Sequence, residues 1–184
     1  MIRTLILLFF FLFCFSVKSD EKQKIIENFK TIKNLSFYFK QTINGITDTG
    51  NCIIQYPKKI YCAYSLRNKK ILVSNGKSLV IKNKKNNQYY YYPLHSTPFE
   101  LLLDKNYILN VISKSKTKLI NDKYYYFLIK NSNYEINIFF DKKNHDLLGW
   151  QTEDIYQNMT ITFIYDLKIN TIINKKLFIL PTRN

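Results

Sequence analysis

The amino-acid sequence predicts a mainly β domain of the α+β class, in which an antiparallel meander curls into a sheet or partial barrel and short helices are added. Three observations predict this fold. Apolar and polar residues alternate with a period of two along most of the chain after residue 34, as in half-buried strands. Polar turns separate these stretches at short intervals. Helical spacing occurs only near residues 20–33 and 97–112.

The first nineteen residues have the organisation of a secretory signal peptide. Arg3 precedes an unbroken apolar run from Leu5 to Phe15, and a short polar stretch ends at Ser19. The run is shorter than the roughly 20 apolar residues that a transmembrane helix needs. We therefore expect residues 1–19 to be a cleaved signal peptide rather than an anchor, and residues 20–184 to form a single domain.

The chain is strongly basic, with 28 Lys and Arg residues against 13 Asp and Glu. Without Arg3 and Lys18 it carries 26 against 13, a net charge of +13. Such an excess attracts nucleic acids, anionic membranes or acidic partners. Because the basic residues are scattered and the chain is expected to be exported, we expect no nucleic-acid partner and only a loose attraction to anionic lipid headgroups.

Residues 20–33 are predicted to form an amphipathic helix with Asp20 as its N-cap. Its apolar residues recur at helical spacing: Ile25, Ile26, Phe29 and Ile32. The period changes to two over residues 35–43, which predicts a strand, and Asn44-Gly45 marks the following turn.

The next two strands are predicted to form a hairpin centred on Pro57. In that register Ile54 faces Ile60 and Cys52 faces Cys62, all on one side of the sheet. A disulfide between directly opposed cysteines is geometrically possible in an oxidising compartment. Two reduced cysteines buried in a core are the alternative. The sequence leaves both states open.

A second hairpin is indicated by Asn75-Gly76, which separates apolar runs at residues 70–74 and 77–82. A tyrosine strand at residues 89–92 follows, and its odd and even side chains are expected to face opposite sides.

The β pattern is interrupted at Thr97-Pro98-Phe99-Glu100. A cap residue, a proline at the first helical position and a glutamate at the third predict a capping box. The leucines at 101–103 make this short helix apolar nearly all round, so it must bury most of its surface. Residues 104–112 are expected to form a second short helix.

The second half of the chain returns to strands separated by polar turns. Their expected bounds are Tyr124–Lys130, Tyr134–Phe140, Asp146–Thr152, Met159–Leu167 and, last, Lys176–Leu180.

No group of residues indicates catalysis. The histidines His95 and His145 stand in a loop and a turn, and neither has a nucleophile or carboxylate at motif spacing. Cys52 and Cys62 are not spaced as a redox pair. We therefore expect no enzymatic activity, no cofactor and no metal.

The apolar phases of the predicted strands define one inner face. Its expected residues are Leu35, Phe37, Phe39, Ile54, Ile60, Leu72, Leu79, Ile81, Ile136, Ile138, Phe140, Trp150, Ile161 and Phe163. Such a face is either a packed core or the wall of a half-closed barrel, in which an acyl chain can displace the covering helices.

Several segments, taken in order, resemble the outer-membrane lipoprotein carrier protein family, LolA. They are Phe39-Lys40-Gln41-Thr42, Gly50 with Tyr56-Pro57 and Tyr64, residues 71–79, Tyr92-Pro93, Thr97-Pro98-Phe99, Leu101-Leu102-Leu103 and residues 177–181. The resemblance spans nearly all of the chain after residue 19.

This resemblance implies an unclosed, strongly curved antiparallel half-barrel with short α-helices covering an apolar cavity. The inner-face residues, with Phe99, Leu102 and Leu103, would hold the acyl chains of lipoproteins. Tyr56, Pro98, Phe99 and Leu102 would form the lid. The implied partners are an inner-membrane ABC-type releasing complex and an outer-membrane acceptor, and the implied role is that of a monomeric periplasmic carrier.

The sequence also departs from the resembled family. Well-known members have an arginine before the hairpin proline that helps to hold the lid closed, whereas this chain has Tyr56. A hydrogen bond from the Tyr56 hydroxyl to a helix carbonyl is one hypothesis for a replacement. Cys62 stands where the family has an aromatic residue. We also expect no C-terminal extension for the releasing complex, because the sequence ends soon after Pro181.

Two other functions remain open, because a fold does not fix a function. The same domain can bind another lipid or glycolipid, or sense lipoproteins through a regulatory partner. An enzyme acting on lipid or glycan would need His95 or His145 beside a carboxylate in a pocket.

Overall fold

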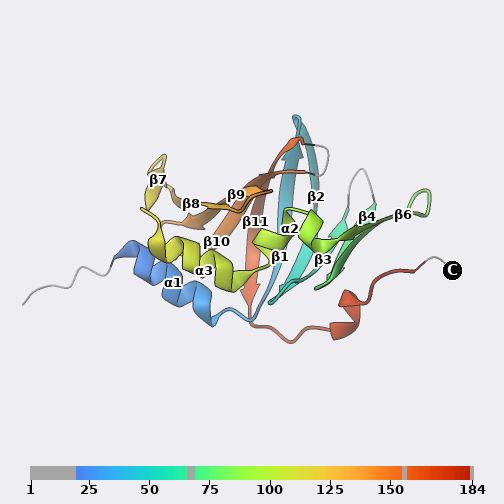
Figure 1. Ribbon diagram of the computed structural model, residues 1–184, viewed down its shortest axis with the longest axis horizontal. Helices are drawn as coiled ribbons and strands as arrows, with labels where there is room; N and C mark the ends of the chain where they lie inside the picture. The colour runs from blue at the N-terminus through green and yellow to red at the C-terminus, as the bar shows by residue number, and fades with distance from the viewer. Residues whose placement is uncertain (1–19, 66–68, 155–156, 183–184) are drawn as a thin grey trace, which may run out of the picture.

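The protein is a single curved antiparallel sheet, with helices packed against its concave face (Figure 1). The computed structural model describes residues 20–65, 69–154 and 157–182, so the expected signal peptide lies outside the described residues. In the described residues, eleven strands follow the order β6-β5-β4-β3-β2-β1-β11-β10-β9-β8-β7. The terminal strands β6 and β7 do not pair, so the barrel is not closed. The predicted mainly β, half-open fold is confirmed.

The strands form two meanders joined at the centre of the sheet. The first comprises β1 (Asn34–Ile43), β2 (Ile46–Gln55), β3 (Lys59–Tyr64), β4 (Lys70–Asn75), β5 (Ser78–Asn83) and β6 (Gln88–Pro93). The second comprises β7 (Lys118–Ile120), β8 (Tyr124–Lys130), β9 (Glu135–Asp141), β10 (Leu147–Glu153) and β11 (Met159–Ile169). β1 pairs with both β2 and β11, which joins the two meanders.

The hairpin between β2 and β3 has the predicted register. Ile54 pairs with Ile60 and Cys52 with Cys62, and the peptide bond before Pro57 is cis. The two cysteine side chains form a disulfide in the buried core. Gly50 on β2 has the ring of Phe39 and the carbonyl of Ala63 so close that a Cβ atom would stand 2.2 Å from that oxygen.

Two longer helices lie side by side across part of the concave face: α1 (Glu21–Thr31) and α3 (Lys105–Lys114) (Figure 1). Asp20 caps α1 by accepting from the Lys22 N–H, and Asp104 caps α3 by accepting from the Tyr107 N–H. The Lys105 ammonium donates to the carbonyls of Lys30 and Ile32 at 2.9 and 2.6 Å. These contacts fix α3 against the end of α1.

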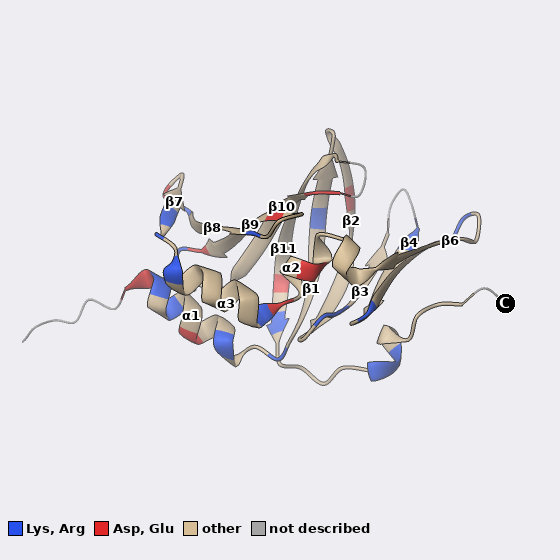
Figure 2. Cartoon of the chain, viewed as in Figure 1, with Lys and Arg blue, Asp and Glu red and all other residues tan. Residues whose placement is uncertain are grey.

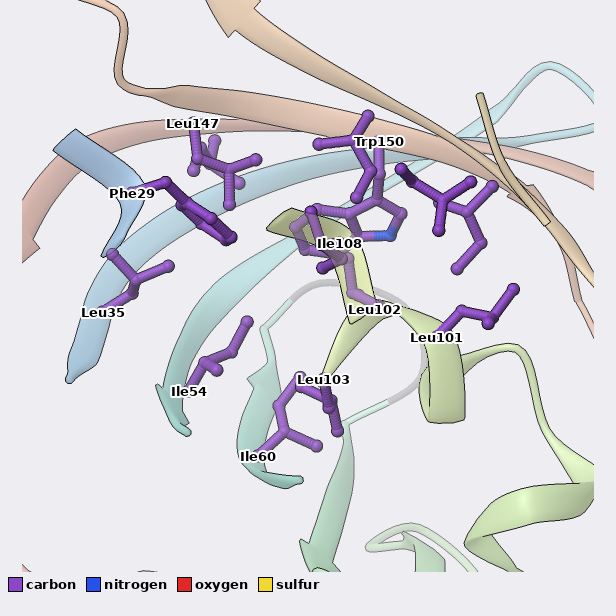
Figure 3. Close-up of a cluster of buried hydrophobic side chains, with 14 of the residues drawn as sticks. Phe29, Leu35, Ile54, Ile60, Leu101, Leu102, Leu103, Ile108, Leu147 and Trp150 are labelled. Carbon is purple, nitrogen blue, oxygen red and sulfur yellow. The ribbon is translucent and has the colours of Figure 1, made fainter. Parts of the chain in front are cut away.

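The core beneath these helices is aromatic and fully buried. The Phe29 ring on α1 meets the rings of Phe140 and Tyr56 edge-on, with centroids 5.6 and 5.8 Å apart. Leu35, Leu147 and Ile108 pack around the same centre (Figure 3). The helix predicted for residues 20–33 therefore contributes an aromatic contact between the sheet and its cover.

The short elements differ from the sequence-based expectation. The helix expected over residues 97–103 is reduced to α2 (Phe99–Leu102), preceded by the 3-10 helix η1 (Leu94–Ser96). The capping box is wrong, because the Thr97 hydroxyl donates to the Leu94 carbonyl and the side chain gives α2 no cap. The last expected strand, Lys176–Leu180, is also wrong: η2 (Lys175–Phe178) is a 3-10 helix packed on the outer side of β3 and β4.

The inner-face assignment is wrong for β11. Thr160, Thr162 and Ile164 are buried, whereas Ile161 is only half-buried and Phe163 is 40% exposed on the convex face. Trp150 on β10 stands opposite Thr162 and fills the interior there, so a small side chain fits beside it. Because strand side chains alternate, one buried threonine turns the apolar residues on either side outward.

Lysine and arginine residues are spread over helices and strands rather than gathered in one segment of the chain (Figure 2). Within the described ranges, no helix is both long and apolar enough to cross a membrane.

Candidate functional site

A partly enclosed cavity of about 250 Å³ lies under α2, between two walls of the curved sheet. One wall comes from β4 to β6 and contains Leu72, Leu79, Ile81, Tyr90 and Tyr92. The opposite wall comes from β9 to β11 and contains Ile136, Trp150, Thr152 and Thr160. Pro98, Phe99 and Leu102 form the roof. The lining is mostly apolar, which suits a hydrocarbon ligand.

One end of the cavity is polar. Gln41, Lys70 and Asn83 line it together with Glu153 and Asp154. The Lys70 ammonium lies 4.3 Å from the centre of the Tyr64 ring, and burial lowers the pKa of Lys70. The Tyr64 hydroxyl donates to Gln41 Oε1, and Gln41 Nε2 donates to Thr162 Oγ1. These two hydrogen bonds give the Gln41 and Tyr64 side chains partners at this end of the cavity.

The roof helix is short and has little support of its own. α2 has four residues, and the buried side chains of Leu101 and Leu102 point into the interior (Figure 3). It packs against η1 and α3. A helix this short gains little from its own hydrogen bonds, so tertiary contacts hold it in place.

An ion pair fastens the roof to the hairpin between β2 and β3. Lys58 Nζ lies 2.5 Å from Glu100 Oε1 on α2 and 3.9 Å from Asp104 Oδ2 at the start of α3. The hydrogen bond with Glu100 raises the pKa of Lys58. The Lys58 N–H also donates to the Leu103 carbonyl at 3.0 Å. We call these contacts the Lys58 latch.

The cavity gathers part of the predicted acyl-binding set. Seven predicted residues line it: Leu72, Leu79, Ile81, Phe99, Leu102, Ile136 and Trp150. Eight belong instead to the buried core that continues from the cavity: Leu35, Phe37, Phe39, Ile54, Ile60, Leu103, Ile138 and Phe140. Ile161 and Phe163 lie outside both, on the outer side of β11.

Sequence reasoning missed several lining residues. Tyr64, Tyr90 and Tyr92 lie on the inner phase of their strands, which the alternation along β3 and β6 could have shown. Lys70 shares the inner phase of β4 with Leu72, but a charged residue gives no apolar signal. Asp154 follows the end of β10, where alternation gives no signal. The lining contains neither histidine: His145 pairs with Glu21 at the start of α1, and His95 is exposed.

The family model described as "Outer membrane lipoprotein carrier protein LolA" matches residues 30–180. The chain belongs to the LolA family. A comparison with curated proteins finds no match.

Solved structures of similar fold have low identity to this chain. A LolA superfamily protein from Nitrosomonas europaea is 8% identical, with a TM-score of 0.45, over 85% of this chain and 96% of that one. A putative outer membrane lipoprotein-sorting protein domain from Vibrio parahaemolyticus is 8% identical, with a TM-score of 0.47, over 86% and 97%. LprF from Mycobacterium bovis is 10% identical, with a TM-score of 0.43, over 84% and 96%. Membership of the LolA family rests on the sequence match.

The structure also corrects the expected replacement for the family's lid arginine. The Tyr56 hydroxyl is buried and has no hydrogen-bond partner among the described residues, so it does not reach a helix carbonyl. Burial raises the pKa of this hydroxyl above its ordinary value. Its ring packs instead on Phe29. Lys58, two positions later in the same hairpin, makes the contacts to the lid segment in this LolA-family chain.

Proposed function

We propose that this protein carries the acyl chains of lipoproteins through the periplasm. The observation that carries the proposal is the apolar cavity under a four-residue helix. Membership of the LolA family supports the same cargo. Each methylene removed from water contributes about 0.8 kcal/mol, so an anchor with several acyl chains cannot cross an aqueous compartment alone.

The size of the cavity supports a lid that moves. Its volume of about 250 Å³ lies just below the range of about 300–1,000 Å³ that is typical of ligand pockets. An anchor with several chains therefore requires α2 to lift, or its chains to extend into the adjoining, more polar hollow of about 740 Å³ that shares Tyr92, Pro98 and Thr152. Lifting α2 exposes Leu101 and Leu102, which costs about 1.5–3 kcal/mol for each leucine. This cost lowers the affinity for the cargo, and a carrier has to release what it binds.

The proposed cargo route begins at an inner-membrane ABC-type releasing complex and ends at an outer-membrane acceptor. In this route the Lys58 latch holds the empty carrier closed, and acyl chains displace Phe99 and Leu102 when they enter. In this route the polar end of the cavity, at Gln41 and Lys70, would receive the polar part of the cargo next to the acyl chains.

The test is native mass spectrometry of the protein extracted from the periplasm. We expect a bound lipidated N-terminal peptide or whole lipoprotein, and loss of this species in Leu102→Glu. Bound phospholipid or glycolipid alone would move the function to general lipid binding.

The matching assay in vitro adds a synthetic lipidated peptide and follows the emission of Trp150, the single tryptophan, which lines the cavity. No change in emission, with no copurified lipid, would contradict the proposal.

A further inference from the structure

On β11, the more apolar of the two alternating sets of side chains faces outward. Ile161, Phe163 and Tyr165 alternate with the buried Thr160, Thr162 and Ile164, so the aromatic side chains of this strand face away from the core. Phe163 is 40% and Tyr165 48% exposed, although a sheet normally turns its apolar phase inward. This inversion is a structural cost unless something covers the outer face.

Neighbouring strands extend this surface into a patch. Tyr38 on β1 pairs with Tyr165, and the two rings stack with centroids 5.8 Å apart. Phe139 on β9 stacks on Phe163, with centroids 6.1 Å apart, across Gly149 of β10. A Cβ atom at position 149 would stand 2.1 Å from the Thr162 carbonyl oxygen. Because Gly149 has no side chain, the Phe139 and Phe163 rings can contact each other across it. We call Tyr38, Phe139, Phe163 and Tyr165 the outer aromatic patch.

The packing of the sheet explains only part of this patch. Phe139 is 6% exposed because Phe163 and Tyr124 cover it, so this pair has a structural role over the glycine. Tyr38 and Tyr165 stack on each other in solvent, with 52% and 48% exposed. η2 covers the outer face at β3 and β4, but it makes no comparable contact with β1 or β11.

Lysines stand at both ends of the patch. Strand pairing forms one row of residues across the sheet from β1 through β11, β10, β9 and β8 to β7. In that order the row contains Lys40, Phe163, Gly149, Phe139, Tyr126 and Lys118. Lys118 Nζ lies 5.4 Å from the centre of the Tyr126 ring, and exposed Lys168 on β11 follows the row of Tyr38 and Tyr165. Asp166 is an exposed acidic neighbour. The patch thus combines aromatic rings with a basic margin.

We propose that the outer aromatic patch docks on the surface of an anionic phospholipid bilayer. Tyrosine rings have an apolar body and a polar hydroxyl, which suits the boundary between headgroups and acyl chains. Each lysine near an anionic surface contributes about a fivefold gain in binding. The net charge of +13 over residues 20–184 adds a general attraction.

The occupant is a bilayer rather than a second copy of the chain. A two-fold dimer through this patch would bring two sets of the same lysines together, and like charges oppose such an interface. The patch lies on the convex face, opposite α2, so a bilayer bound there leaves the lid uncovered. Docking is therefore independent of whether the cavity holds cargo.

The test is cosedimentation of the purified protein with vesicles. One set contains phosphatidylcholine only, and the other contains phosphatidylethanolamine with about a quarter of phosphatidylglycerol. We expect binding to the anionic vesicles alone, weakened by salt because the attraction between exposed charges is screened. Tyr38→Ser/Phe163→Ser/Tyr165→Ser should lower the partition coefficient at least tenfold. Ile46→Ser, which removes another exposed apolar side chain, should leave it unchanged.

A second variant tests the same proposal if the triple variant does not fold. Lys40→Gln/Lys168→Gln changes only exposed charges and should weaken binding to anionic vesicles about twentyfold to thirtyfold. Lys84→Gln/Lys85→Gln, in the turn between β5 and β6, is the matched charge control and should have a much smaller effect. Equal loss in the two lysine variants, no binding by the wild type, or a wild-type dimer that the triple variant dissociates would each overturn the proposal.

Discussion

Two regions of the concave face are filled in different ways. Beneath α1 and α3, two helices of eleven and ten residues press Phe29 and Ile108 into the sheet, and both side chains are fully buried. Beneath α2, a helix of four residues covers a cavity between Leu79 and Trp150. We call these the filled region and the cavity region. The difference indicates that the first supplies stability and the second is left available for a ligand.

The contacts that hold α2 to the sheet also differ from those that hold α1 and α3 together. α1 and α3 are tied by lysine ammonium groups on backbone carbonyls, including Lys22 on Ser113 and Lys105 on Ile32. The α2 segment is tied to the sheet through Lys58, which pairs with the Glu100 side chain and whose backbone N–H donates to the Leu103 carbonyl. Lifting α2 breaks an ion pair and one backbone hydrogen bond and exposes two leucines, whereas lifting α1 would expose the aromatic core. The lid can therefore open while the filled region stays intact.

The largest expected effect comes from Phe29→Ala in the filled region. This substitution leaves a void beside Phe140 and should lower the free energy of unfolding by about 3–5 kcal/mol. Urea unfolding measures the change. Acyl binding below the unfolding transition should stay close to that of the wild type.

Ile81→Ala is the matched substitution in the cavity region. Ile81 is half-buried and already borders empty space, so its loss should cost less than about 2 kcal/mol. Similar costs for the two variants would show that the cavity region is as closely packed as the filled region.

The second effect concerns the roof of the cavity. Leu102→Glu places a carboxylate where the wall is apolar, and it can be solvated only if α2 opens. We expect acyl affinity to fall at least tenfold, as measured by Trp150 emission on titration with a lipidated peptide. Leu102→Met keeps the volume and should bind nearly as well as the wild type. Unchanged affinity in Leu102→Glu would remove Leu102 from the lid.

The sequence predicted the filled region better than the cavity region, for physical reasons. Phe29 lies on a regular amphipathic helix, and the pairs around Pro57 follow from strand alternation, so local periodicity determined both. The cavity is the unfilled space between α2 and the two walls of the sheet. Its presence depends on how distant elements pack, which no local sequence pattern encodes. Lys58 and Glu100 are 42 residues apart and meet only because the hairpin reaches α2.

The error on β11 has a similar origin. Ile161, Phe163 and Tyr165 form the more apolar phase, so periodicity places them inside. Thr162 is nevertheless buried, because Trp150 occupies the space opposite and Gln41 donates a hydrogen bond to the threonine hydroxyl. A tertiary contact decided which phase faces the core. The Tyr56 hypothesis failed for the same reason, since the ring was drawn to Phe29.

The third effect tests the Lys58 latch directly. Lys58→Met removes the ion pair with Glu100 while keeping an apolar side chain, and the two charged groups are 33% and 24% exposed. The expected loss is about 1 kcal/mol, because a partly solvated pair contributes little. If the latch holds the lid shut, the same loss should raise acyl affinity up to about fivefold. Stopped-flow mixing with a lipidated peptide should show faster entry.

Lys59→Met is the control for this variant. Lys59 begins β3 beside the same hairpin, and its ammonium makes no ion pair in the described structure. Its affinity for acyl chains should match that of the wild type. A fall in affinity for Lys58→Met would mean that Lys58 supports the bound state and does not restrain the empty one.

The smallest effect is electrostatic and belongs to the filled region. Glu21 at the start of α1 accepts from Lys24 Nζ at 2.8 Å and contacts His145 Nε2 at 2.5 Å. The hydrogen bond with Lys24, and to a smaller extent the one with His145, lowers the pKa of Glu21 from 4.5 to about 2. Because the pKa is lower in the folded state, the stabilisation is complete above pH 4.5 and is lost as the pH falls toward 2. Glu21→Gln should therefore unfold at a slightly lower temperature than the wild type at pH 7.

This difference should shrink as the pH falls from 4.5 to 2, as followed by thermal melts in a pH series. Glu27→Gln is the control on the same helix, because Glu27 accepts a hydrogen bond from Gln23 but makes no ion pair among the described residues. It should show little dependence on pH relative to the wild type. Acyl affinity should be unaffected by either substitution, since the Glu21 site lies on α1 and the cavity lies under α2. A change in affinity for Glu21→Gln would show that the filled region and the cavity region are coupled, and that stability and binding are not divided between them.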